Sequence, residues 1–403
     1  DLIWFPIYPI QGPIDRADLR TSITGMNDFP QATLDMWQAR VAAILKGESA
    51  EKLAGRTADG LRIEPLYQRI EGLRAERAEH APWTVMQRVD HTDGVKANTQ
   101  ALDDLENGAG GLCIVNKDAD VGRALQGVAL HAIHTRLEGG DGLAKAFAAY
   151  VKTQPIDPAR LDVSFGMGDV KELVAQGFKG PFLDADGRVF HEQGASEAQE
   201  LACVLAQIVG ALRKFENLSP ESIVGATLAA NQDMFLTLAK FRAIRLLWAR
   251  VLEASGIAHQ PLHLHGETSR RMMARLDPHT NILRATAAVF GAGLGGADTF
   301  TVLPFSIAQG LPNAFARRMA RNTQLILLEE SQLWRVSDPA SGSGYIESLT
   351  QELCERAWAI FQSIEKSGKL PVFDSKNTSS DPVIGTKIHQ LPKEFEAAVE
   401  SVP

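Results

Sequence analysis

The sequence predicts a (β/α)₈ barrel, an α/β TIM-barrel fold with an N-terminal extended arm and C-terminal helices. From Trp83 to about residue 305, short runs typical of strands alternate with longer amphipathic segments, which is the order that a parallel barrel requires. The 403 residues exceed the usual domain size, yet barrels reach this length as one unit. An open, doubly wound sheet is the alternative.

Eight strands are predicted, in the order Trp83–Val89, Gly111–Asn116, Val128–Arg136, Leu161–Phe165, Pro181–Phe190, Ser222–Ala226, Leu262–Glu267 and Thr299–Pro304. The clearest helices between them are Leu143–Lys152, Ser196–Phe215, Asp233–Ala254 and Asn281–Ala292. In the helix that begins at Asp233, apolar residues recur near helical spacing. We therefore expect its Lys240, Arg242 and Arg250 to face water.

The remaining segments flank the barrel. A helix is predicted before it at Gln31–Lys46, and trailing helices are predicted at Ala314–Leu327 and Ile346–Glu365. After Gly368 the chain is rich in Lys, Ser, Asn and Asp, which suggests a mobile tail. The interpretation divides the chain into an arm, a helix with a linker, the barrel with its trailing helices, and a tail, at residues 1–35, 36–82, 83–368 and 369–403.

The composition argues against several classes of partner. A net charge of −8 and the lack of a dense Lys/Arg cluster disfavour nucleic acid. No apolar run reaches the ~18 residues needed to span a membrane, and the hydrophobic stretch Leu2–Ile10 lacks the leader of a signal peptide. Cys113, Cys203 and Cys354 lie in apolar patterns, as buried, reduced thiols of a cytoplasmic protein do.

Polar residues near the strand carboxyl ends are the first candidates for chemistry, because barrel active sites gather there. His263, His265 and Glu267 alternate along one strand and share a face. They could hold a metal ion, as in barrel hydrolases, or line the barrel as hydrogen-bonded polar groups. Near the fifth strand, His191 and Glu192 would allow acid–base work or belong to an ordinary loop.

Two further patterns are more typical of structure than of chemistry. His131 and His134 would fall on opposite faces of a strand. The glycine cluster Gly291–Gly296 ends a helix and precedes a strand, whereas a phosphate loop must follow a strand and open a helix. We interpret these glycines as a helix end with close packing.

Seven longer motifs occur at Pro82–Gln87, Gln199–Ala202, Ala239–Trp248, Asp277–Arg284, Leu294–Asp298, Arg321–Gln324 and Asp338–Ser343. They resemble motifs of the methylmalonyl-CoA mutase family, in the family's order, over about residues 27–368. The resemblance implies a barrel that threads the pantetheine arm of an acyl-CoA along its axis. It also implies a separate cobalamin domain over the strand ends, where adenosylcobalamin starts a radical rearrangement between methylmalonyl-CoA and succinyl-CoA.

The chain departs from the pattern of catalytic family members at the positions that handle the substrate. Arg88 stands where their R-Q-Y motif has a tyrosine, and Val189 stands where their G-Y-H motif has a histidine. Phe165 matches a glutamine near the substrate carboxylate. The arginine and serine that hold the CoA nucleotide correspond to Ile223 and Gly225.

One pocket residue of the family is retained, His265, and it is the candidate for substrate binding. Glu267 replaces a neighbouring glutamine, and the family's cobalt-ligating motif D-x-H-x-x-G is missing. Gly168–Phe182 is also too short to contain the family's loop with a carboxylate-binding arginine. Losing several polar contacts together removes the basis for binding a transition state.

The resemblance therefore implies the small subunit of a heterodimeric mutase, without a catalytic residue, a metal or a cobalamin-binding domain of its own. Adenosylcobalamin would be bound by the partner, a catalytic large subunit. The alternative is a substrate-binding subunit that works with a separate cobalamin protein and uses Arg88, Arg188 and His265 as replacement donors. A metal-dependent hydrolase is the third hypothesis.

Overall fold

The computed structural model describes two stretches of the chain, residues 32–373 and residues 398–400. Within the first stretch, residues 74, 76, 78–80 and 116–119 are not described. It divides into two compact units, residues 1–55 and 56–403. The first unit contains helix α2 (Leu34–Leu45), which begins after the N-cap Thr33, and the short helix η2 (Ala50–Leu53). The predicted first helix is confirmed, while residues 1–31 of the predicted arm lie outside the described residues.

The second unit is built around eight parallel strands, β3 (Thr84–Val89), β4 (Gly111–Ile114), β5 (His134–Leu137), β6 (Asp162–Ser164), β7 (Leu183–Asp186), β8 (Val224–Ala230), β9 (Leu264–Thr268) and β10 (Thr299–Thr301). Their order is β6-β5-β4-β3-β10-β9-β8-β7, so the last strand pairs with the first. The short strands β1 (Gly55–Arg56) and β2 (Arg62–Ile63) lie outside this sheet.

Two backbone hydrogen bonds bridge the remaining gap between β6 and β7. Phe165 N donates to Pro181 O at 2.9 Å, and Asp184 N donates to Gly166 O at 2.8 Å. Gly166 has a φ of +65°, and a Cβ there would lie 2.3 Å from Leu137 O, so this close approach requires glycine. The nearly closed ring confirms the predicted barrel, and the doubly wound alternative is wrong.

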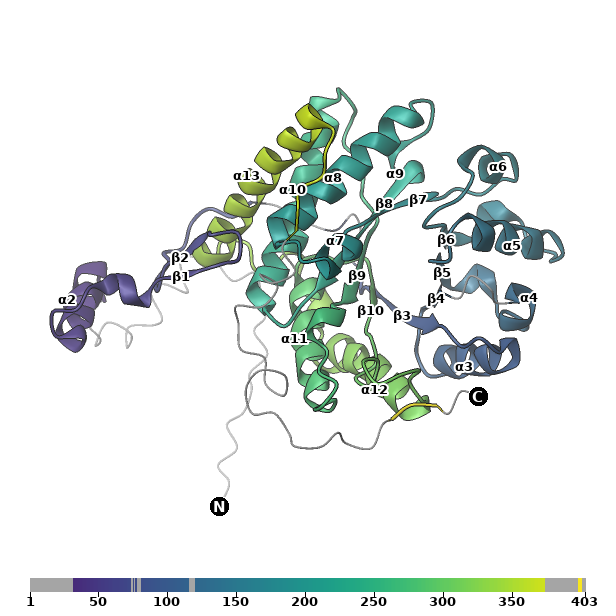
Figure 1. Cartoon of the computed structure of the whole chain (residues 1–403), viewed down its shortest axis with the longest axis horizontal. Coiled ribbons are helices and arrows are strands. Elements are labelled where there is room, and N and C mark those ends of the chain that lie inside the picture. The colour runs from purple at the N-terminus through teal and green to yellow at the C-terminus, as the bar shows by residue number, and fades with distance from the viewer. Residues whose placement is uncertain are drawn as a thin grey trace, which may run out of the picture. The chain divides into compact units, whose positions relative to one another are not determined.

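Helices surround the strands (Figure 1), as the alternating pattern predicts. They are α3 (Gly94–Glu106), α4 (Val121–Ala124), α5 (Asp141–Lys152), α6 (Val170–Ala175), α7 (Arg188–Glu192), α8 (Glu197–Lys214), α9 (Pro220–Ile223), α10 (Met234–Ala254), α11 (Thr280–Leu294), α12 (Ala314–Leu325) and α13 (Gly344–Ser367). Short helices occur at η3 (Leu130–Ala132), η4 (Pro158–Arg160), η5 (Arg270–Met272), η6 (Ile326–Glu330) and η7 (Leu333–Arg335). Among the described residues, no helix combines the length and apolar character that a membrane crossing demands.

The fifth and third predicted strands differ most from the observed ones. The fifth was expected to reach Phe190, but β7 ends at Asp186 and α7 follows at once. The Asp186 carboxylate accepts a hydrogen bond from Arg188 N at 2.9 Å, which fixes this turn. The third strand begins only at His134, because residues Leu130–Ala132 form a short 3₁₀ helix. His131 therefore does not share a strand with His134.

The prediction that Lys240 and Arg242 face water is wrong. Both side chains are fully buried, because α10 packs against α8 on one side and α13 on another. Lys240 Nζ lies 2.7 Å from Glu200 Oε2 of α8. Arg242 binds Asp338 at 2.8 Å and Glu347 of α13 at 3.0 Å. Arg250, in contrast, is largely exposed, as predicted.

The predicted mobile tail also needs correction at its end. Among residues 369–403 the structure describes 369–373 and 398–400. Val399 forms an antiparallel bridge with Pro312, which lies between β10 and α12. At least this part of the tail is therefore held against the barrel.

A cluster of phenylalanines fills the space between β6 and the helices outside it. Phe165 is completely buried, with ring centroids 5.0 Å from Phe178 and 6.2 Å from Phe147. Phe182 contacts the same ring at 5.9 Å. These edge-to-face and tilted contacts bury large apolar areas.

Replacing Phe165 with alanine should lower the free energy of unfolding by ~3–5 kcal/mol, because a cavity remains where the ring was. Urea denaturation followed by circular dichroism measures the change. Val174→Ala on the exposed side of α6 is the matched control and should stay within ~0.5 kcal/mol of the wild type. Equal stabilities of the two variants would contradict the packing described here.

Candidate functional site

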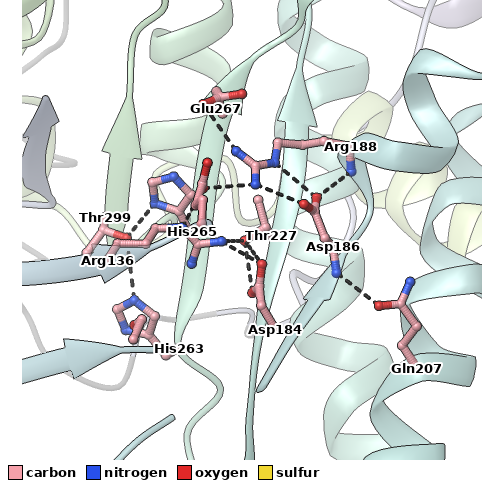
Figure 2. A network of polar contacts seen from close by, with 12 residues as sticks. Arg136, Asp184, Asp186, Arg188, Gln207, Thr227, His263, His265, Glu267 and Thr299 are labelled. Carbon is pink, nitrogen blue, oxygen red and sulfur yellow. Dashed lines mark hydrogen bonds and ion pairs between the residues drawn. The ribbon is translucent and has the colours of Figure 1, made fainter. Parts of the chain in front are cut away.

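Charged side chains from four strands meet inside the barrel, and Figure 2 shows those of β5, β7 and β9. Side chains alternate along a strand, so residues two apart point to the same side. On β5 and just beyond it these are His134, Arg136 and Glu138, and on β9 and just before it they are His263, His265 and Glu267. Arg88 of β3, Asp184 and Asp186 of β7, and Arg188 of α7 meet them.

Arg136 is at the centre of this network and is 1% exposed. Its Nε donates to Glu138 Oε1 at 2.8 Å, and its Nη2 lies 2.5 Å from Asp184 Oδ2. The same nitrogen donates to Thr227 Oγ1 at 2.7 Å. Thr227 in turn donates to the Asp184 carboxylate at 2.8 Å. Both carboxylates that face this guanidinium are therefore hydrogen-bonded as well as paired.

The network continues toward the carboxyl ends of the strands. Arg188 lies 2.9 Å from Glu138 and 3.1 Å from Glu267, and it also binds Asp186 at 2.8 Å. Arg88 donates to Glu267 Oε2 at 2.8 Å. Arg88 and Arg188 thus share Glu267, and both also lie within 4 Å of Glu138, as Arg136 does.

The electrostatics favour the charged forms of Glu138 and Arg88, whereas burial outweighs Arg136 at Asp184 and raises the pKa of that carboxyl. Burial raises the pKa of Glu138, but the three surrounding guanidiniums outweigh it and hold the pKa well below its usual range. Burial lowers the pKa of Arg88, but Glu267 and the other carboxylates raise it above its usual value. Glu138 and Arg88 remain charged because each has counterions inside the barrel.

A chain of imidazoles and hydroxyls runs below the ion pairs. His265 Nδ1 lies 2.8 Å from Thr299 Oγ1, which is 3.4 Å from His263 Nε2. The His263 ring stacks on His134 with centroids 5.0 Å apart. His134 Nδ1 lies 2.9 Å from Asp162. Burial and then Arg136 lower the pKa of His265 well below its usual value, so this ring is neutral.

Two cavities open at opposite ends of the barrel. The one at the amino ends of the strands has a volume of about 560 Å³ and is lined by residues that include Thr84, His134 and His263. The other, at the carboxyl ends, has a volume of about 230 Å³ and is lined by Arg88, Glu138, Glu267 and others. Arg136, Asp184, Thr227 and His265 line neither cavity and occupy the strand positions between them.

Comparison with known proteins assigns the chain to a family. The family model described as methylmalonyl-CoA mutase matches residues 182–373. The methylmalonyl-CoA mutase small subunit of Streptomyces virginiae is 37% identical, and the match covers 84% of this chain and 64% of that protein. The small subunit of Propionibacterium freudenreichii subsp. shermanii is 32% identical, with 88% and 66% covered. This chain belongs to the methylmalonyl-CoA mutase family.

The match leaves part of the relatives outside it. The probable methylmalonyl-CoA mutase small subunit of Mycobacterium tuberculosis (strain ATCC 25618 / H37Rv) is 35% identical, and the match covers 82% of this chain and 65% of that protein. The chain thus spans slightly less than two thirds of the length of these family members.

The structure of this mutase-family chain brings some predicted site residues together and separates others. Arg88 and Val189 both line the carboxyl-end cavity, while His265 lies in the layer between the cavities. Phe165 belongs to the phenylalanine cluster and lines neither cavity. Ile223 is buried at the end of α9, and Gly225 follows on β8 beside Asp184.

The side chains proposed as metal ligands have other partners in the structure. Thr299 contacts both His263 and His265, and Glu267 is paired with two arginines. Among the described residues, no group of three or more His, Cys, Asp or Glu side chains is arranged to hold a metal ion.

Sequence reasoning missed a second buried network beside the carboxyl-end cavity. Ser269 Oγ lies 2.7 Å from His191 Nε2, and His191 Nδ1 lies 3.4 Å from Glu200. Burial raises the pKa of Glu200, but Lys240 and His191 outweigh it and lower the value to about 2. The residue types resemble a nucleophile–base pair.

The three backbone amides from Ser269 to Arg271 already have acceptors and are not free to bind an oxyanion. Ser269 N donates to Ala230 O, and Arg270 N donates to Glu192. Arg271 N donates to the Ser269 hydroxyl itself. An acyl-transfer site needs such donors free and aimed at the reacting oxygen. We therefore interpret the Ser269–His191 pair as a structural contact of the mutase-type barrel.

Replacing Arg136 with methionine should lower the free energy of unfolding by ~3–5 kcal/mol, because Asp184 and Glu138 lose a buried counterion. Urea denaturation at pH 7 measures this. Adding Asp184→Asn to Arg136→Met removes one unmatched charge and should recover part of the loss. Arg250→Met, at a largely exposed ion pair, should change stability by less than ~1 kcal/mol. A neutral effect of Arg136→Met would refute the central role of this residue.

The stacked histidines should make stability depend on pH. Burial and then His134 lower the pKa of His263 to about 4 from 6.5. Between these values the unfolded chain binds the extra proton and the folded chain does not, so stability falls as the pH drops from about 6.5 to 4. His263→Gln should reduce this slope by up to about one proton. The free energy of unfolding of both proteins is measured between about pH 4 and 6.5. If His263→Gln showed the same slope as the wild type, His263 would not be the group responsible.

Proposed function

We propose that this chain is the small subunit of an adenosylcobalamin-dependent mutase that interconverts methylmalonyl-CoA and succinyl-CoA. In this proposal it acts in the cytoplasm as the non-catalytic partner that stabilises a catalytic large subunit in a heterodimer. The observation that carries the proposal is the layer of Arg136, Glu138 and Asp184 on the barrel axis. The names of the relatives from Streptomyces virginiae and Propionibacterium freudenreichii, which include the words small subunit, support the pairing.

The axial layer opposes substrate binding on energetic grounds. A pantetheine arm threaded along the axis would have to displace Arg136 from its carboxylates, because this residue lies between the two cavities. Breaking a buried ion pair without a replacement costs ~3–5 kcal/mol. An acyl-CoA offers a thioester and amides along this path, and neither group can neutralise Asp184 or Glu138.

The residues at the strand carboxyl ends do not fit a corrin ring. Arg88 stands there and is held by Glu267 at 2.8 Å. The nearby imidazoles of His191 and His265 are fully buried and contact Ser269 and Thr299. Neither ring is open to a cobalt ion, so we assign the adenosylcobalamin of this proposal to the large subunit.

The donors required by the alternative function are already engaged. Arg88 and Arg188 both bind Glu267, and Arg188 also binds Asp186 and Glu138. Among the donor atoms of these three side chains, Arg88 Nε and His265 Nε2 have no hydrogen-bond partner in the described part of the chain, and Arg88 Nε lies 3.6 Å from the Asp90 carboxylate. One guanidinium nitrogen and one buried imidazole nitrogen are insufficient to replace the contacts that hold a thioester, a carboxylate and a nucleotide.

The proposal is tested by mixing the purified chain with a catalytic mutase chain that carries the R-Q-Y and G-Y-H motifs. Alone, this chain should not convert methylmalonyl-CoA in the presence of adenosylcobalamin, and isothermal titration should detect no binding of methylmalonyl-CoA. Size-exclusion chromatography with light scattering should show a 1:1 complex. The catalytic chain should lose activity more slowly on heating when it is in the complex.

A double variant tests whether the Arg136 layer by itself prevents catalysis. Arg88→Tyr with Val189→His restores two family residues but leaves the Arg136 layer in place, so it should remain inactive alone. Turnover by the unmodified chain without a partner would refute the non-catalytic role. Failure to form a complex with any catalytic chain from the same organism would refute the subunit role.

A further inference from the structure

The end of the described chain lies in a site that its own contacts define. Segment Ala398–Glu400 runs antiparallel to Leu311–Asn313, which connects β10 to α12 (Figure 1). Asn313 N donates to Ala398 O at 3.1 Å, and Glu400 N donates to Leu311 O at 2.8 Å. Pro312 lies between these bonds, at the position of an antiparallel bridge that needs no N–H.

Side chains add a second level of recognition. Ser306 Oγ donates to Ala398 O at 2.8 Å. Gln100 Nε2 of α3 donates to Glu400 Oε1 at 2.6 Å. Gly310 lies under Val399, since a Cβ at Gly310 would be 3.5 Å from a Val399 methyl group. The site thus binds both the main chain of the segment and the Glu400 carboxylate.

His91 completes the grip on that carboxylate. Its Nδ1 accepts a hydrogen bond from Asp93 N at 2.9 Å, so a neutral ring carries its hydrogen on Nε2. This Nε2 lies 3.3 Å from Glu400 Oε2. The backbone contact therefore fixes the tautomer that presents a donor to Glu400.

We propose that this rim of the barrel is a strand-addition site for an extended segment that carries a carboxylate side chain, and that its occupant is the chain's own Ala398–Glu400. Strand addition obtains affinity from main-chain hydrogen bonds and selectivity from side-chain seats. Here the seats are formed by Gly310 for valine and by Gln100 with His91 for glutamate.

The docked segment acts as a strap beside the paired strands β3 and β10. His91 and Gln100 follow β3, whereas Ser306 and Leu311–Asn313 follow β10, and these are the first and last strands of the ring. The strap therefore ties together the loops after both strands. It also holds the start of α12, whose Arg317 donates to Arg88 O at 2.7 Å.

Hydrogen–deuterium exchange on the full chain tests the strap. Gln100→Glu places a like charge against Glu400, and it should speed exchange of the peptides that contain Asn313 and Glu400 about tenfold. Thr99→Glu adds the same charge at an exposed neighbouring position of α3 and should leave both peptides at the wild-type rate. Gln100→Glu combined with Glu400→Gln exchanges acceptor and donor and should restore protection.

A variant in the tail tests the same contact without altering α3. Glu400→Ala alters only the segment, so it should release Asn313 while exchange of a β8 peptide stays unchanged. The proposal is overturned if Gln100→Glu and Glu400→Ala both exchange as the wild type does, or if the wild-type segment exchanges at the rate of an unfolded chain. Protection that grows with protein concentration, together with a dimeric mass in sedimentation equilibrium, would place the segment on a second copy and overturn its assignment to its own chain.

Discussion

A guanidinium is tolerated on the axis of a barrel only where carboxylates meet it, and this requirement organises the interior of the chain. Arg136 binds Glu138 and Asp184, and Glu138 also binds Arg188. Arg188 reaches Glu267, which holds Arg88 at the strand ends. Every ion in this series shares a counterion with another, so Arg88 and Glu267, two of the positions where the chain departs from the family pattern, depend on each other rather than varying separately.

Much of the fold could be predicted from the sequence because strands and helices differ in period. All eight barrel strands were located, and the pairing of β10 with β3 follows from closing them in order. The errors occurred where side-chain contacts, which periodicity does not reveal, determine the end of a strand or the burial of a helix face. The side chain of Asp186 caps the turn that ends β7 early. Lys240 and Arg242 looked solvent-facing because a helix pattern does not reveal how many neighbours cover it.

The site could be predicted only in part. Motif comparison located Arg88, Val189 and His265 as positions of interest, and two of these line one cavity. It could not indicate what replaced the lost functions, because Arg136, Asp184 and Glu138 become neighbours only when distant strands curl into a ring. The Ser269–His191–Glu200 contacts were missed for the same reason, since they join residues 78 and 9 positions apart across three elements.

Helix α10 has a consequence for how far the folding unit extends. Its neighbouring positions face opposite ways, with Lys240 bound to Glu200 beside the barrel and Arg242 bound to Glu347 of α13. Ending the polypeptide before Gly344 would remove Glu347 and Thr350, two of the four groups that accept hydrogen bonds from Arg242, and would uncover the faces of α8 and α10 that α13 packs against. The smallest autonomous version of this barrel therefore has to retain α13, and designs that graft the ring onto other proteins must carry that helix with it.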